Sequence, residues 1–437
     1  MYRKLAGFTL LAVVITGCGV PGGPPDTQGT EGTGFRPVDA NAALLWDRQT
    51  LETAELIGQI ADEFNSSRNG MPVKVEHLGG YTDINRKVSV SIQARTLPAM
   101  AVGYESMTSE YARARAVVPL DPYIEDPEIG MSEEDLADFF PGMLQSNIYP
   151  QLDGGMYSFP FTKSVLMMYF NKRVLRAAGI ESPPKTWDEF LAQCRQIKER
   201  TGVSAYAVDI DCSTLDGMIY SMGGELVRDT ESLFDQPPTI RLFELLATLA
   251  KEDLAYRIQP GTYDDREEFA RDRAAFFFRS SSHRPYTAAL FGANTDDWGM
   301  AMIPQANPEA PVTVLYGGNI CVFRTTQEHE RTAWEFIKHF TSPEISVRWA
   351  LGSGYLPIRK SAASHPDMQA FFEQWEFNRA AFDCLPYARP EPNLVGWQEV
   401  RTLVERAAAE VMNGLKEPAQ AAEALKRQAD AAIAAAR

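Results

Sequence analysis

Short apolar segments alternate with amphipathic segments through the first part of the chain. Residues 43–46, 71–76 and 99–103 have the length and composition of β-strands. Between the first two, apolar residues recur at helical spacing from Leu51 to Phe64, and residues 87–95 are also helical in pattern. This β-α-β-α-β order predicts parallel strands joined by crossover helices, which is an α/β fold.

The residues that directly follow these strands are candidates for ligand contact. In open α/β sheets, ligands bind beyond the carboxyl ends of the strands. Asp47, Tyr81 and Glu105 occupy those positions. Two of them have a plain structural alternative: Tyr81 follows two glycines in what is also a typical surface turn, and Glu105 is placed to cap a helix at 107–115.

The second half of the chain continues the α/β pattern. A long apolar strand is predicted at 165–170, and Thr186 with Glu189 forms a capping box for a helix that ends near Gly202. Further strands are predicted at 274–278, 299–303 and 313–323, and further helices at 239–251, 330–340, 343–351 and 400–436, the last interrupted near Gly414 and Pro418.

The N-terminus has the pattern of a secretory signal. Arg3 and Lys4 precede an apolar run, 5–15, that is too short to span a bilayer as a mature helix. The run ends at Ile15-Thr16-Gly17-Cys18, which resembles the bacterial lipobox, whose Cys receives the lipid. Residues 19–34 are rich in Gly and Pro and predict a flexible tether. We therefore expect a lipoprotein attached to a bacterial membrane, with the alternative of a plain secreted protein.

Composition narrows the class of partner. The chain has 437 residues, 42 Lys+Arg and 58 Asp+Glu, so its formal net charge is −16. No basic cluster is present to bind nucleic acid, so nucleic acid is not an expected partner.

The length of the chain indicates more than one domain. At about 150 residues per domain, 437 residues correspond to two or three domains.

Few features favour catalysis, a cofactor or a metal. The chain lacks the GxSxG, HExxH, Walker and dinucleotide-binding motifs. Besides Cys18 there are four cysteines, at 194, 212, 321 and 384; no pair is spaced CxxC, and their disulfide state stays open. We expect no enzyme activity, no cofactor and no metal site, with a secreted glycosidase as the least favoured alternative.

An ordered set of segments resembles one protein family, the extracellular solute-binding proteins of ABC importers, in particular the large carbohydrate-binding group that includes maltose-binding and glycerol-3-phosphate-binding proteins. No segment is decisive alone, but together they span about residues 40–430. The matching segments are GGMYSFPF at 154–161, YFNK at 169–172, PPKTWDEF at 183–190, GGN at 317–319, AWEFI at 333–337, SPE at 342–344, GYLPI at 354–358 and WQEVR at 397–401.

The resemblance implies two α/β lobes, each a mainly parallel sheet flanked by helices, that close around a ligand by a hinge motion. By similarity, the chain crosses between the lobes near Thr162–Ser164, near Ile303-Pro304 and around Trp349–Gly354. The resulting division is a signal peptide at 1–17, a lipidated Cys18 and linker at 18–36, lobe 1 at 37–161 and 305–348, and lobe 2 at 165–302 and 355–437. The implied protein is an extracytoplasmic monomer that delivers its ligand to an ABC permease; a ligand-sensing lipoprotein is the alternative.

A sugar site combines polar groups for the hydroxyls with an aromatic face for the C–H surface. The candidates chosen on that basis, by strand-end position or by similarity, are Asp47, Tyr81, Glu105, Lys163, Ser164, Ser281, Ser282, His283, Gly318, Tyr355, Arg389 and Trp397. Each has a structural alternative: Lys163 as a solvated hinge residue, the serines as a polar loop, and Trp397 as a core residue in the first turn of the last helix. His283 has no partner at metal-ligand spacing.

The charge of the ligand stays open between two possibilities. Trp397, placed where maltose-binding relatives stack an indole on sugar, favours a neutral mono- or oligosaccharide, which is the expected ligand. Lys163 and Arg389 together favour a phosphorylated polyol such as glycerol 3-phosphate, because Arg matches phosphate in a bidentate manner. However, the segment that follows Arg389 is Pro390-Glu391-Pro392, which departs from the Gly-rich pattern of those relatives.

Overall fold

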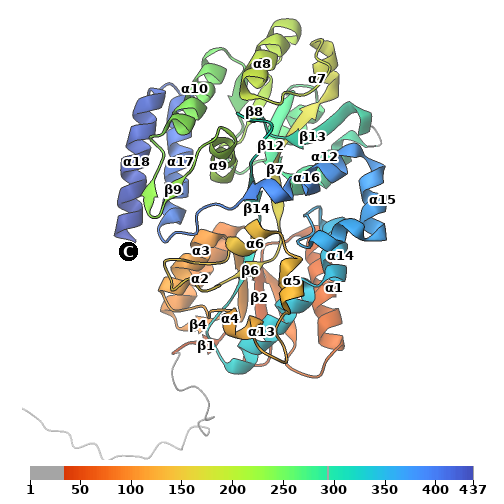
Figure 1. Cartoon of the computed structure of the whole chain (residues 1–437), viewed down its shortest axis with the longest axis vertical. Helices are drawn as coiled ribbons and strands as arrows, with labels where there is room; N and C mark the ends of the chain where they lie inside the picture. The colour runs from red at the N-terminus through yellow and green to blue at the C-terminus, as the bar shows by residue number, and fades with distance from the viewer. Residues whose placement is uncertain (1–33, 293–294, 437) are drawn as a thin grey trace, which may run out of the picture. The chain divides into compact units, whose positions relative to one another are not determined.

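The structure, a computed structural model, describes residues 34–292 and 295–436, which form one compact unit. Cys18 and the predicted signal and most of the tether lie outside the described residues. Two separate sheets organise the unit, and the ribbon in Figure 1 shows the helices gathered around each of them. The prediction of two α/β lobes is confirmed.

Lobe 1 is built on a five-stranded sheet of order β3-β2-β5-β15-β6. Its strands are β2 (Ala43–Asp47), β3 (Val73–His77), β5 (Met100–Gly103), β6 (Phe159–Pro160) and β15 (Asn319–Val322), with a separate pair of short strands, β1 (Arg36–Pro37) and β4 (Thr96–Leu97). Its helices are α1 (Leu51–Ser66), α2 (Tyr81–Gln93), α3 (Glu105–Arg113), α4 (Asp121–Ile124), α5 (Glu133–Ala137), α6 (Pro141–Gln145), α13 (Gln327–Phe340) and α14 (Pro343–Ser353).

Lobe 2 is built on a seven-stranded sheet in which β7 is central. Its strands are β7 (Ser164–Asn171), β8 (Tyr206–Val208), β11 (Ala255–Arg257), β12 (Phe276–Ser280), β13 (Trp298–Met302), β14 (Thr313–Tyr316) and β16 (Ala388–Arg389), with a small hairpin of β9 (Val227–Arg228) and β10 (Glu231–Ser232). Its helices are α7 (Lys172–Ala177), α8 (Trp187–Thr201), α9 (Cys212–Ser221), α10 (Pro237–Lys251), α11 (Asp264–Ala270), α12 (Arg284–Phe291), α15 (Pro366–Gln374), α16 (Glu376–Asp383), α17 (Trp397–Met412) and α18 (Pro418–Ala435).

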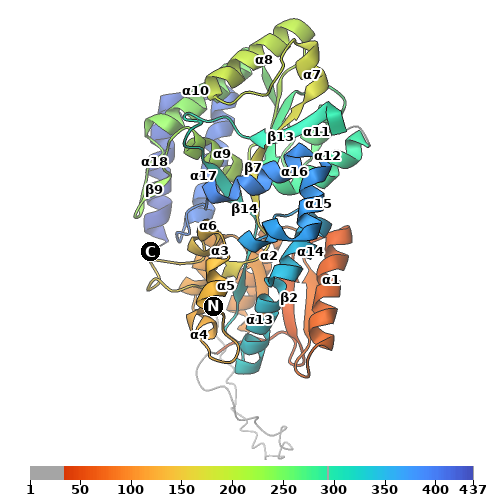
Figure 2. The same ribbon diagram turned by 45° about the vertical axis from the view of Figure 1, so that its right-hand side comes forward.

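Distant parts of the sequence pack together in each lobe. In lobe 1, α13 and α14 from late in the chain pack against α1 from its start, and Figure 2 shows these helices side by side. In lobe 2, α17 and α18 pack against α10. The capping box predicted at the start of α8 is present, since the Thr186 hydroxyl accepts from the Glu189 N–H at 3.2 Å, and Gly202 ends that helix with φ 74°. Each lobe is therefore assembled from discontinuous segments.

The sheets contain more antiparallel pairing than predicted. In lobe 1 the pairs β2–β3 and β2–β5 are parallel, whereas β15 runs antiparallel to both of its neighbours. In lobe 2, β7 is antiparallel to β12, β13 and β14. The crossings explain the difference, because a strand that enters a sheet from the other lobe needs no crossover helix.

The chain first passes between the lobes from β6 to β7, at residues 161–163, which the predicted crossing at Thr162–Ser164 overlaps. The second passage differs from the prediction at Ile303-Pro304: it lies at Gly317-Gly318, between β14 and β15, so residues 305–316 do not belong to lobe 1. Gly317 has φ 99°, and a Cβ atom there would lie 1.9 Å from the Thr162 backbone oxygen. The single strand predicted at 313–323 is therefore two buried strands, one in each lobe, separated by this Gly-Gly turn.

The third passage also lies later than the predicted Trp349–Gly354. After α14 the chain remains on lobe 1: Arg359 donates from Nε to the Thr341 carbonyl at 2.8 Å, and the Lys360 N–H donates to the Asp138 carbonyl at 2.7 Å. The chain then reaches lobe 2 through α15 and α16, the latter packing on β13 and β7. Gly354 ends α14 with φ 80°, which marks a helix end but not the exit from the lobe.

Candidate ligand site in the cleft between the lobes

Two adjoining cavities lie between the lobes, each of about 170 Å³, and they share Arg48, Ser282, His283 and Tyr355. The mixed chamber contains both arginine and aspartate, and its lining residues are Arg48, Tyr81, Tyr104, Ser164, Asp209, Asp211, Arg279, Ser280, Ser282, His283, Tyr316, Gly317 and Tyr355. The arginine chamber is lined by Arg48, Gln49, Thr50, Leu51, Thr53, Tyr263, Arg266, Ser282, His283, Tyr286, Ser353 and Tyr355. Both lobes contribute to each chamber.

Charges in the mixed chamber are largely paired. Arg279 contacts Asp209 at 2.5 Å and Asp265 at 2.6 Å. Burial raises the pKa of Asp209 to about 6, against the opposing effect of Arg279. Asp211 accepts from the Tyr316 hydroxyl at 2.9 Å and from the Thr214 N–H at 3.0 Å. The carboxylates have further lone pairs, so this chamber is suited to accept hydrogen bonds from ligand hydroxyls.

Aromatic rings cover one wall of the mixed chamber. The Tyr81 and Tyr104 rings lie 4.3 Å apart, and the Arg48 guanidinium lies 4.9 Å from the centre of the Tyr81 ring. The Tyr81 hydroxyl is buried and has no hydrogen-bond partner among the described residues, and burial holds its pKa well above the usual range. A neutral phenol with an unused donor and acceptor next to a cavity is a typical ligand contact.

His283 lies where the two chambers meet. Its Nδ1 atom has no hydrogen-bond partner among the described residues. Burial lowers its pKa well below the usual value, and the neighbouring positive charges of Arg279, Arg266 and Arg48 lower it further. The imidazole is therefore neutral at physiological pH, and it offers one donor and one acceptor to the cleft.

Five of the predicted residues are brought together in the cleft. Tyr81, Ser164, Ser282, His283 and Tyr355 line one or both chambers. The Ser164 and Ser282 hydroxyls both contact the Ser280 hydroxyl, each at 2.7 Å.

Glu105 and Lys163 lie in a different environment, which we call the crossing cluster (Glu105, Asn147, Ser158, Lys163 and Asn319). Glu105 is 6% exposed and Lys163 fully buried. The Glu105 Oε1 atom accepts from the Asn319 amide at 2.9 Å and from Lys163 Nζ at 3.3 Å. The Asn147 amide donates to Asn319 Oδ1 at 3.0 Å, and Ser158 donates to Asn147. None of the five lines either chamber, so the cluster ties the first two crossings together beside the cleft.

Three more predicted residues lie next to the cleft without lining it. Asp47 is buried, accepts from the Gln49 N–H at 2.7 Å and contacts His77 at 3.3 Å. Ser281 accepts from the Val165 N–H at 3.3 Å. Gly318 lies against the Tyr81 ring, since a Cβ atom at 318 would be 2.8 Å from the Tyr81 hydroxyl.

Trp397 and Arg389 are placed away from the chambers. Trp397 is fully buried in the lobe 2 core, stacked on Phe234 at 5.9 Å, so it presents no face to a sugar. Arg389 is at the sheet edge, where its guanidinium forms an ion pair with Glu225 and lies 4.4 Å from the Tyr220 ring. The structure thus brings neither side chain to the chambers, contrary to the prediction, because each is held by a partner within lobe 2.

Several lining residues were missed by the sequence analysis. Arg48 and Tyr104 each neighbour a predicted residue, Asp47 and Glu105, and alternation along an extended chain points neighbouring side chains in opposite directions. Asp209 and Asp211 follow β8, a parallel strand whose carboxyl end faces the cleft. The strand-end rule identifies them once residues 206–208 are recognised as a strand.

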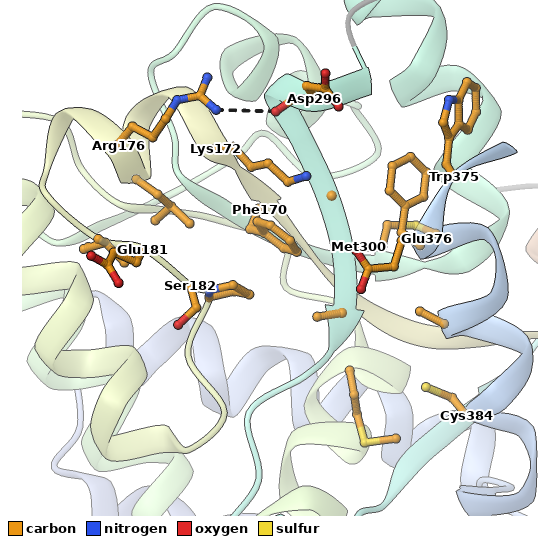
Figure 3. Close-up of a pocket in the computed structure, with 18 of the residues that line it drawn as sticks. Phe170, Lys172, Arg176, Glu181, Ser182, Asp296, Met300, Trp375, Glu376 and Cys384 are labelled. Atoms are coloured by element: carbon orange, nitrogen blue, oxygen red, sulfur yellow. Dashed lines mark hydrogen bonds between the residues drawn. The ribbon is translucent and has the colours of Figure 1, made fainter. Parts of the chain in front are cut away.

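A larger hollow, of about 900 Å³, lies elsewhere on lobe 2, between β13 and α16. Figure 3 shows Phe170, Met300 and Trp375 around it, and Arg176 donating to the Asp296 carbonyl. It contains none of the predicted site residues, and its walls come from lobe 2 alone rather than from both lobes. Its size therefore does not make it the ligand site of a two-lobed protein.

The described cysteines are free and buried, which answers the question of disulfides among them. Burial raises the pKa of Cys321 and of Cys384 to about 12. Cys212 lies with Asp216 and Glu391 in a group whose ligand-type atoms are within 4.8 Å of one another. The Arg401 guanidinium donates to Glu391 there and supplies the counter-charge, so the group does not require a cation.

Among the described residues, no helix combines the length and the apolar character needed to cross a bilayer.

Comparison with known proteins gives consistent results. The family model described as "Bacterial extracellular solute-binding protein" matches residues 59–374, more than half of the chain. The sn-glycerol-3-phosphate-binding periplasmic protein UgpB of Yersinia pseudotuberculosis is 25% identical over 398 residues, which cover 86% of this chain and 88% of UgpB.

Solved structures share the fold at low identity. The sugar-binding protein MalE from Xanthomonas citri superposes with a TM-score of 0.78 at 20% identity, covering 90% of this chain and 98% of MalE. UgpB from Mycobacterium tuberculosis, in complex with glycerophosphocholine, gives a TM-score of 0.77 at 18% identity, covering 91% of this chain and 99% of UgpB.

Proposed function

The chain belongs to the family of bacterial extracellular solute-binding proteins, and from this premise we propose that it captures a sugar in the cleft between its lobes and delivers it to the membrane subunits of an ABC importer. The observation that carries the proposal is the pair of chambers lined from both lobes. A ligand that contacts both lobes stabilises the closed form, because it gains contacts there that the open form lacks.

The chemistry of the mixed chamber supports a polyhydroxylated ligand. Asp209 and Asp211 offer acceptors, Arg279 offers donors, and Tyr81 and Tyr104 offer aromatic faces. A ring of hydroxyls with apolar C–H faces matches this set. The relatives named as a sugar-binding protein and as an sn-glycerol-3-phosphate-binding protein support the same class of ligand.

A phosphorylated polyol is the second candidate ligand. The arginine chamber favours it, because Arg48 and Arg266 line that chamber with no Asp or Glu among its lining residues. The relative named for glycerol 3-phosphate supports this candidate.

A thermal-shift screen of sugars, sugar alcohols and glycerol phosphates, followed by calorimetry, tests the function. A true ligand raises the melting temperature by mass action and is recovered chemically unchanged, as expected for a carrier without catalysis. If the protein converts the sugar to a product, or if no polyhydroxylated compound binds, the proposal is wrong.

We also propose that the protein is anchored by a lipid on Cys18 and acts as a monomer. The support is the lipobox-like Ile15-Thr16-Gly17-Cys18 behind a basic start and an apolar run. In fractionation, the Cys18→Ser variant is expected in the soluble fraction and the unaltered protein in the membrane fraction. Membrane attachment of the variant would contradict the anchor.

A further inference from the structure

The arginine chamber has an unusual balance of charge for so acidic a protein. The chain carries a formal net charge of −16, yet the chamber is lined by two arginines, and none of its described lining residues is Asp or Glu. The mixed chamber differs, because Arg279 there has Asp209 and Asp265 as partners. No described carboxylate thus lines this end of the cleft, although Asp265, adjacent to Arg266 in the chain, acts on that guanidinium through its charge.

Neither arginine of this chamber forms an ion pair within 4.0 Å among the described residues. Arg48 donates from Nη1 to the Tyr355 hydroxyl at 2.9 Å, and its Nε atom has no partner. The Arg266 guanidinium lies 4.3 Å from the Tyr263 ring and 5.2 Å from the Tyr286 ring, and its Nε atom also has no partner. Both retain donors for an oxyanion, which a guanidinium can hold in a bidentate manner.

A helix N-terminus opens into the same chamber. Residues 50, 51 and 53 of its lining form the start of α1, a helix of 16 residues, and Thr50 at the N-cap makes no side-chain capping bond. The first N–H groups of a helix lack intrahelical partners and carry partial positive charge. Beside them, Gln49 is 5% exposed and its Nε2 atom has no partner among the described residues. An anion at this position would satisfy these donors together.

We propose that the ligand carries an oxyanion, a phosphate or a carboxylate, which binds in the arginine chamber between Arg48 of lobe 1 and Arg266 of lobe 2, while its hydroxyls occupy the mixed chamber. This rests on the proposed function. It assigns the anion to arginines that the sequence analysis had not selected, in place of Lys163 and Arg389.

The arrangement also has a consequence for closure. Arg48 belongs to lobe 1 and Arg266 to lobe 2, and both line this chamber. An oxyanion that binds both guanidiniums is attracted to both lobes, and it therefore favours the closed form. A neutral sugar of the same shape lacks this contribution, so discrimination against it follows from charge rather than from shape.

The experiment compares matched ligands by calorimetry on the full soluble chain. The pairs are glycerol with glycerol 3-phosphate, and glucose with glucose 6-phosphate and with glucuronate; the phosphate and carboxylate arms identify the oxyanion, and inorganic phosphate alone tests whether the hydroxyls are needed. We expect an anionic member to bind at least roughly tenfold more tightly than its neutral partner, and the difference to shrink as salt is raised.

Substitutions distinguish the loss of a charge from the loss of the fold. Arg48→Met and Arg266→Met are each expected to weaken binding of the anionic ligand roughly 10- to 100-fold, with Arg48→Lys and Arg266→Lys losing less. Arg389→Met is the matched control, since Arg389 lies outside both chambers with Glu225 as partner, and it should leave affinity unchanged. Melting curves of all variants report on folding.

The outcomes distinguish the two proposals. If a neutral sugar binds as tightly as its anionic partners, or if both Met variants retain full affinity for the anionic ligand, the inference is wrong and the sugar-binding function stands. If no member of any pair binds, the proposed function itself is wrong, and the inference fails with it.

Discussion

The crossing cluster lies beside the cleft and the arginine chamber lies within it; both are polar, but they differ in how much of their hydrogen-bonding capacity is used. In the crossing cluster, Glu105 accepts from Lys163 and Asn319, which are held in turn by the surrounding crossings. In the arginine chamber, Arg48 and Arg266 keep donors that no described residue accepts. A polar group whose partners are already present supports the fold, whereas one without a partner is available to a ligand.

The largest expected effect is on the crossing cluster. Glu105→Gln leaves Lys163 buried without its counter-charge, and we expect a loss of about 3–5 kcal/mol in the free energy of unfolding. Chemical denaturation measures it. Removing both charges in the double variant Glu105→Gln/Lys163→Met should recover most of the loss. A single variant as stable as the unaltered protein would contradict the structural role assigned to this cluster.

An effect of about the same size is expected for Trp397, which the sequence placed in the ligand site. Because the side chain is fully buried against Phe234, Trp397→Ala should cost about 3–5 kcal/mol of stability. Ligand affinity, measured by calorimetry at a temperature where the variant is folded, should change less than about threefold. A selective loss of affinity at unchanged stability would restore the stacking role.

A smaller effect, on ligand affinity, is expected for Tyr355, which lines both chambers. Tyr355→Phe removes the hydroxyl that accepts from Arg48 at 2.9 Å, and we expect a loss of affinity of about 0.5–1.5 kcal/mol with stability nearly unchanged. Calorimetry and a melting curve measure the two quantities. Tyr157→Phe is a matched control, since the Tyr157 hydroxyl contacts Asp153 at 3.3 Å away from both chambers. Equal losses of affinity in Tyr355→Phe and Tyr157→Phe would contradict the placement of the Tyr355 hydroxyl in the ligand site.

The smallest effect is a pH dependence in the mixed chamber. The pKa of Asp209 is raised to about 6 by burial, with Arg279 opposing and Asp211, Asp265 and Glu405 adding to the rise. Above pH 6 it is a carboxylate that accepts from hydroxyls; below, it is protonated and this acceptor is lost. Affinity should therefore fall a few-fold as the pH falls from 7.5 to 5.

A carboxylate ligand is the right probe for this pH series, because a phosphate itself titrates near pH 6. Asp209→Asn should bind more weakly at pH 7.5 and lose most of the pH dependence. A dependence that persists in Asp209→Asn would assign the titration to another group.

The sequence predicted the α/β pattern, both ends of α8 and most elements, because these depend on local periodicity. The strand-end rule also led to positions 47, 81 and 105, which lie in or next to the candidate cleft. This rule does not say which of two neighbouring side chains faces the cleft: Asp47 points into the protein, whereas Arg48 lines both chambers. Neighbouring side chains on a strand point to opposite sides, and sequence alone locates the end of a strand only to within a few residues.

Contacts between residues that are far apart in the sequence could not be predicted from local patterns. Nothing near Arg389 in the chain shows that Glu225 is its partner, and nothing near Trp397 shows that Phe234 covers it. The crossing at Gly317 was missed for a similar reason, because the Thr162 backbone oxygen that leaves no room for a Cβ atom at 317 belongs to another crossing.

The four described cysteines, none more than 4% exposed, make the protein convenient for optical measurement. A thiol-reactive dye would find them inaccessible and would label one introduced cysteine instead. Position 51 suits that purpose, because Leu51 is 72% exposed at the edge of the arginine chamber. A soluble Cys18→Ser/Leu51→Cys protein carrying an environment-sensitive fluorophore would then report cleft occupancy directly as a change in emission.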